Sequence, residues 1–99
     1  RSFAAVAASV AAEIARDGRP GDCVLPHYLR PSHLALFAYH GGIRFAAGED
    51  SDCAFALHRD VAGSLLDDGG PPGRWTLVWE GHRPGLAREA IRLYRRAID

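Results

Sequence analysis

Glycine and proline divide the 99-residue chain into seven short segments rich in apolar residues, and this division limits the fold more than any other feature. Four segments carry helical spacing or helix start and stop signals. The three segments between them are short apolar runs without helical spacing, which is typical of buried strands. The sequence therefore predicts the element order α-β-α-β-α-β-α.

The predicted elements follow from these signals. Three strands are expected, at residues 23–25, 43–47 and 75–79. Four helices are expected: from the N-cap Ser2 to the stop signal Gly18, from His33 to about Tyr39, within residues 53–66, and from Pro84 to the end of the sequence.

Regular alternation of strands and helices favours a parallel sheet with right-handed crossovers and helices on both faces. We therefore expect the α/β class: a small three-layer sandwich with a three-stranded, mainly parallel sheet and about four helices. A chain of 99 residues supports one modest core, so residues 1–99 are predicted to form a single domain. Because the sequence starts at Arg1 without a methionine, we expect this domain to be excised from a longer membrane protein.

The charge balance excludes one large class of function. Twelve arginines and no lysine balance twelve acidic residues, so the formal net charge is zero. Proteins that bind nucleic acids usually carry a basic excess, and we expect no nucleic-acid partner. A hydrophobic content of 47% argues against a disordered tail, and no apolar run approaches the roughly 18 residues of a membrane span.

The two cysteines, Cys23 and Cys53, leave two interpretations open. They are too few to define a disulfide framework. A single bridge is permissible outside the cytoplasm, and two buried thiols fit the sequence equally well.

Candidate ligand-binding residues follow the predicted strands, because ligands of open parallel sheets bind beyond the carboxyl ends of the strands. These residues are His27, Tyr28, Glu49, Asp50, His82 and Arg83. Converging imidazole, carboxylate and guanidinium groups would form a binding site, although solvated loops carry the same residue types.

The sequence contains no complete catalytic set. A Gly-x-Ser-x-Gly elbow and a Cys-x-x-Cys pair are both absent, and the glycines near residue 20 follow a helix instead of a strand. Of the five histidines, His33 and His40 lie roughly 10 Å apart on a continuous helix, too far to share an ion. We therefore predict no catalytic residue, no metal and no cofactor in this chain.

Three stretches resemble a known class of proteins. An alanine-rich helix precedes Arg-Pro-Gly-Asp-Cys-Val-Leu-Pro at residues 19–26, and Arg-Pro-Ser-His-Leu and Gly-Arg-Trp-Thr-Leu-Val-Trp follow at residues 30–34 and 73–79. This layout is similar to the extracytoplasmic soluble domain of multi-pass membrane glycosyltransferases of the GT-C class, the mannosyltransferase-like enzymes that use polyprenyl-phosphate sugars.

The resemblance implies a parent glycosyltransferase that takes a sugar from a lipid-phosphate donor at the outer side of the cell membrane. Its catalytic acid would lie in a loop absent from this chain, so the isolated domain is expected to be a non-catalytic accessory that helps to position an acceptor or partner. The expected location is extracytoplasmic, and the expected partners are the membrane-embedded remainder of the chain and a glycan or lipid phosphate. The predicted last helix carries arginines on its polar side, which either complement the helix dipole near its C-terminus or bind lipid phosphates: Arg88, Arg92, Arg95 and Arg96.

The residues themselves leave other interpretations open. One is a free-standing small α/β enzyme or ligand-binding module with its site at the carboxyl ends of the strands. Another is an interaction domain, which would expose Trp75 or Trp79 to a partner.

Overall fold

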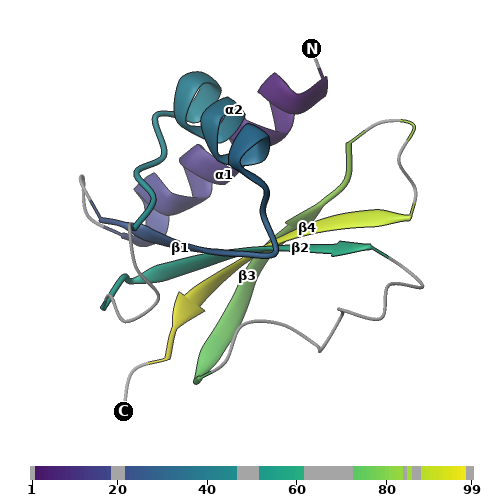
Figure 1. Ribbon diagram of the computed structural model, residues 1–99. Helices are drawn as coiled ribbons and strands as arrows, with labels where there is room; N and C mark the ends of the chain where they lie inside the picture. Colours follow the sequence, from purple (N-terminus) through teal and green to yellow (C-terminus); the bar gives the residue numbers. More distant parts are fainter. Residues whose placement is uncertain are drawn as a thin grey trace.

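The computed structural model describes residues 2–18, 22–46, 52–61, 73–83, 85 and 88–97, and the structural statements below concern these residues. They form two helices and a four-stranded mixed sheet, an α+β domain (Figure 1). The elements are α1 (Ser2–Asp17), β1 (Val24–His27), α2 (Pro31–Gly41), β2 (Phe55–Val61), β3 (Trp75–Gly81) and β4 (Glu89–Arg96).

The sheet has the strand order β1-β2-β4-β3. β1 pairs in parallel with β2, whereas β4 runs antiparallel to both of its neighbours. The strands β1, β2 and β3 therefore run in one direction. Their last residues, His27, Val61 and Gly81, lie at the same end of the sheet as Glu89, the first residue of β4, and we call this end the carboxyl end.

Both helices lie on one face of the sheet, which we call the helix face (Figure 1). α1 turns a stripe of buried residues toward the sheet, because Phe3, Val6 and Val10 recur every three or four positions. The stripe joins a core built from α2, the segment after it and alternate strand residues: Val24, Phe37, Ile43, Phe55, Leu57, Ile91 and Leu93. The opposite face, the open face, carries the intervening residues His27, His58, Arg92 and Tyr94. No described helix covers it.

The expected three-layer α/β sandwich with a three-stranded, mainly parallel sheet and about four helices is wrong. Residues 55–61, predicted to be helical, form β2, and residues 89–96, predicted to lie in the last helix, form β4. A spacing of four, such as that of Leu57 and Val61, places two side chains on one face of a helix and also on one face of a strand. Pairing with two neighbouring strands decides between these alternatives for both segments.

Some of the other predicted elements are confirmed and others are not. The first two helices correspond to α1 and α2, and the strand at residues 75–79 lies within β3. The strand predicted at residues 43–47 is reduced, among the described residues, to a single parallel bridge between Phe45 and Val24. The arginines expected along one helix face do not share a face, because Arg92 and Arg96 alternate with Arg95 along β4.

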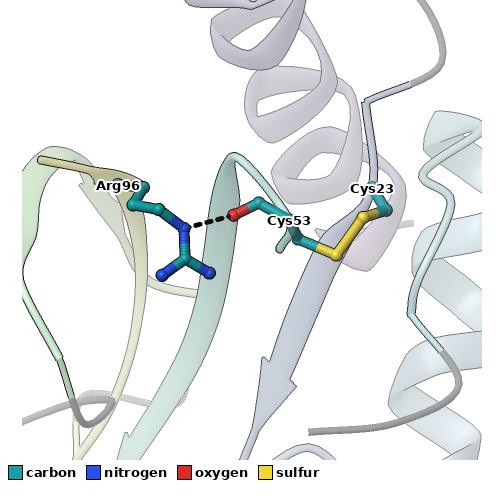
Figure 2. Close-up of a disulfide and its surroundings, with 3 residues drawn as sticks. All are labelled: Cys23, Cys53 and Arg96. Carbon is teal, nitrogen blue, oxygen red and sulfur yellow. Dashed lines mark hydrogen bonds between the residues drawn. A yellow bond between two sulfur atoms is a disulfide. The ribbon is translucent and has the colours of Figure 1, made fainter. Parts of the chain in front are cut away.

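A disulfide joins Cys23 to Cys53, so the bridged alternative is the one that the structure contains (Figure 2). The two Cα atoms are 5.0 Å apart. Cys23 lies one residue before Val24 and Cys53 two residues before Phe55, and the parallel β1–β2 pairing begins with Val24 and Phe55. Arg96 of β4 donates its Nε–H to the carbonyl oxygen of Cys53 at 2.9 Å (Figure 2). The bridge and this hydrogen bond thus tie three strands together at the end of the sheet opposite the carboxyl end.

Neither described helix is both long and apolar enough to span a membrane.

Candidate functional site

The predicted site residues lie at the carboxyl end of the sheet as far as the structure describes them. His27 ends β1 and Tyr28 follows it, while His82 and Arg83 follow β3. Glu49 and Asp50 lie outside the described residues. Because β1 and β3 are the two outer strands, β2 and β4 separate these pairs of residues. The structure places three of them in two different side-chain clusters, one on each face of the sheet: His27 and Tyr28 in one and Arg83 in the other.

The first cluster is a histidine pair, His27 and His58, on the open face. These residues are partners in the β1–β2 register, and their Nδ1 atoms are 2.8 Å apart. The Tyr28 ring stacks on the His27 ring, with centroids 4.3 Å apart and an angle of 26° between the planes. His58 is completely buried, and the rings of His27, Tyr28 and Tyr94 lie within 6.4 Å of its ring centroid. The pair is therefore held in a partly enclosed, aromatic environment.

The backbone conformation of Tyr28 and the hydrogen bond between the two rings constrain the histidine pair. Tyr28 has φ 61°, a left-handed conformation that is uncommon for a residue other than glycine, and it is followed by Leu29 at the turn away from the sheet. A hydrogen bond between two ring nitrogens needs one donor and one acceptor. At least one of the two Nδ1 atoms is consequently without a proton while the contact persists.

Arg92 faces His58 across the β2–β4 pairing and is itself held by two carboxylates. Its Nε donates to Glu80 Oε2, and its Nη1 donates to Asp60 Oδ2 at 2.8 Å. The hydrogen bonds that Arg92 donates to Glu80 and to Asp60 raise its pKa above the usual range. Two carboxylates that share one guanidinium thus lie beside the histidine pair on the open face.

The second cluster is built around the carboxylate of Glu89, on the helix face. Glu89 Oε1 accepts from Arg83 Nε at 2.7 Å, and Oε2 accepts from Arg83 Nη2 at 2.8 Å and from Arg59 Nε at 2.6 Å. The Glu89 side chain is 6% exposed. Burial raises the pKa of Glu89, but the hydrogen bonds from Arg83 and Arg59 outweigh this effect and lower the pKa below its ordinary value. The buried group is therefore an ionised carboxylate at neutral pH.

This cluster joins the helices to the carboxyl end of the sheet. The Arg83 guanidinium lies 4.9 Å from the centroid of the Phe3 ring, at the start of α1. The Phe3 ring in turn stacks on His33 of α2 at 6.1 Å. His33 Nδ1 accepts a hydrogen bond from the backbone N–H of Arg30, and burial, together with Arg59 and Arg83, lowers the pKa of His33. His33 thus acts as a neutral helix-capping residue.

His82 is exposed and is held by a hydrogen bond to the backbone of Glu89. Its Nδ1–H donates to the carbonyl oxygen of Glu89 at 2.6 Å, and a donating Nδ1 leaves Nε2 as the nitrogen that can accept in the neutral ring. The two residues after β3 therefore have different surroundings, because Arg83 packs into the Glu89 cluster while His82 stays at the surface.

Three residues central to these clusters were not among the predicted site residues: His58, Arg59 and Glu89. All three lie on segments predicted to be helical, and their meeting depends on the pairing of β2 with β1 and β4. For the histidine pair, His27 at the end of β1 is the only local signal in the sequence, and it does not indicate which residue of β2 will face it.

A shallow groove of about 370 Å³ lies away from the carboxyl end, between α1 and β3. Its lining residues are Ser9, Ala12, Glu13, Arg16 and Trp79. Glu13 and Arg16 form an ion pair along one wall. None of the predicted site residues lines this groove.

Comparisons with protein-family models, with curated proteins and with solved structures find no match to this chain. The clusters are therefore interpreted from their own chemistry.

Proposed function

We propose that the chain is an extracytoplasmic accessory domain of a polyprenyl-phosphate-sugar-dependent membrane glycosyltransferase, in which it helps to position the acceptor or a partner. The observation that carries this proposal is the Cys23–Cys53 disulfide, since disulfides persist mainly in oxidising compartments outside the cytoplasm. The order of α1, β1 and an aromatic residue, Tyr28, agrees with the layout on which the resemblance rests.

The surface offered to an acceptor is the carboxyl end of the sheet. Tyr28 is 40% exposed, and a phenol ring presents a flat apolar face to sugar C–H groups together with a polar hydroxyl. His82 is exposed at the same end and is fixed by its hydrogen bond to Glu89. Imidazole and phenol groups donate and accept hydrogen bonds, as recognition of a glycan requires.

The test uses the full-length protein that contains the chain, in intact cells. Tyr39→Cys places a thiol on α2 at a residue that is 84% exposed and away from the carboxyl end, and both native cysteines are bonded. A membrane-impermeant maleimide is expected to label this variant without permeabilisation, and to label it more than the unsubstituted protein. Labelling that requires permeabilised cells would contradict the extracytoplasmic location.

Membranes that contain the full-length protein are used to test the positioning role. The paired substitution Tyr28→Ala and His82→Ala is expected to raise KM for the acceptor while kcat changes little, because a positioning surface contributes binding and not chemistry. His40→Ala, at an exposed histidine of α2, is the matched control and should leave both constants unchanged. Equal KM values in all variants would rule out this surface. A ligand-binding module would instead show a phosphosugar-dependent thermal shift in the isolated domain, lost in the paired variant.

A further inference from the structure

The histidine pair has a feature that ring stacking alone does not require: two metal-ligating nitrogens lie side by side. The Nδ1 atoms of His27 and His58 are 2.8 Å apart, on neighbouring residues of two parallel strands. The strand pairing fixes the backbone on both sides, and the stacked Tyr28 ring restricts the His27 ring. Two imidazoles held in this way are pre-organised ligands.

The separation of the two nitrogens selects a coordination geometry. At a metal–nitrogen distance of about 2.0 Å, two ligands at the tetrahedral angle lie ~3.3 Å apart, whereas two adjacent ligands at a right angle lie ~2.8 Å apart. The observed 2.8 Å matches the right angle. Right-angled arrangements of nitrogen and oxygen ligands are typical of Cu²⁺ and Ni²⁺, and Cu²⁺ binds most tightly of the common divalent ions.

The charges around the pair also suit a cation. Arg92 is the positive group that faces His58 across the sheet, and Glu80 and Asp60 both bind its guanidinium. Two carboxylates therefore lie beside the two rings. The rings of Tyr28 and Tyr94 flank His58 and lower the local dielectric, which strengthens this attraction.

We propose that His27 and His58 bind one divalent transition-metal ion, Cu²⁺ in preference to Ni²⁺ and Zn²⁺, through their Nδ1 atoms. The ion replaces the proton between the two nitrogens, and that proton moves to Nε2 of the same ring or to water. The described residues contain no group of three or more His, Cys, Asp or Glu side chains that could hold the ion, so the pair supplies two of its ligands. This inference is independent of the proposed function.

The test is a titration of the disulfide-bonded chain with Cu²⁺ alone in a non-coordinating buffer at pH 7.5, followed by calorimetry and electron paramagnetic resonance. One equivalent is expected to bind first, with a tetragonal signal split by two equivalent nitrogens. Loss of a supporting outer-shell group costs about 10–100-fold in metal affinity, so loss of a ligand in His27→Gln should weaken this step at least about tenfold and remove the two-nitrogen splitting.

His40→Gln is the control, because His40 is an exposed histidine on α2 and should leave the two-nitrogen signal intact. Equal affinity in His27→Gln and the unsubstituted chain would assign the copper to exposed histidines or the N-terminal amine and overturn the proposal. The unsubstituted chain gives a decisive result even if His27→Gln does not fold, because a signal with one nitrogen, or with none, is incompatible with the pair as ligands.

Discussion

Removal of the Cys23–Cys53 disulfide is expected to lower the free energy of unfolding by about 3–4 kcal/mol. The bridge closes a segment with a sequence separation of 30 residues, and the loss of loop entropy in the unfolded chain predicts this magnitude. Domains of this size are stable by only about 5–15 kcal/mol, so the bridge supplies a large share of the total. The closed segment contains β1 and α2, and the β1–β2 pairing starts at the residue after Cys23.

The measurement is urea unfolding of the Cys23→Ala and Cys53→Ala double variant beside the oxidised chain. Alanine is suitable because Cys53 is buried, and serine would add an unpaired hydroxyl there. A thiol reductant should destabilise the unsubstituted chain by a similar amount and leave the stability of the double variant unchanged. This comparison separates the effect of losing the disulfide bond from the effect of the alanine substitutions. A difference below about 1 kcal/mol would show that the unfolded chain is already restricted without the bridge.

Those parts of the fold that depend on local signals could be predicted from the sequence. α1 follows from the spacing of Phe3, Val6 and Val10, and its last turn ends before Gly18 as predicted. α2 begins at Pro31, and its C-cap Gly42 has φ 65°, a conformation that glycine adopts without strain. These signals act within a few residues and need no tertiary partner.

The character of β2 and β4 could not be predicted in the same way. In β4 the buried residues Ile91 and Leu93 alternate with Arg92 and Tyr94, but Ala90 and Leu93 also fit a helical stripe. The arrangement is settled by two ladders of hydrogen bonds, one to β2 and one to β3, that involve residues far away in the sequence. This explains why the fold is α+β with one helical layer and not a three-layer sandwich.

The candidate site could likewise be predicted only in part from the sequence. The positions of His27 and His82 at one end of the sheet follow from the shared direction of β1 and β3, which the sequence indicated. Their partners could not be identified, because His58 and Glu89 meet them only through the register of mispredicted strands. That His27, Tyr28, His82 and Arg83 bind a ligand stays a prediction.

Glu89→Gln is expected to be strongly destabilising, by about 3 kcal/mol. The amide keeps the shape of the side chain but removes the charge that both Arg59 and Arg83 bind. Loss of one partner from a buried ion pair typically costs 3–5 kcal/mol, and the lower end applies because the two arginine side chains are 25% and 19% exposed. The substitution also loosens α1, since Arg83 packs on the Phe3 ring.

Glu80→Gln is the matched control, because the Glu80 side chain pairs with Arg92 but is 43% exposed. An exposed pair contributes about 0–1 kcal/mol, so the free energy of unfolding of this variant should remain close to that of the unsubstituted chain.

The pH dependence of the Glu89→Gln effect shows whether it comes from the lost charge or from disturbed packing. Because the folded pKa of Glu89 lies below its ordinary value of 4.5, its stabilisation is complete above that value and is lost as the pH falls through the folded pKa. The gap between Glu89→Gln and the unsubstituted chain should therefore narrow in acid, and a gap that stays constant down to pH 2 would mean that the amide disturbs packing instead of removing a paired charge.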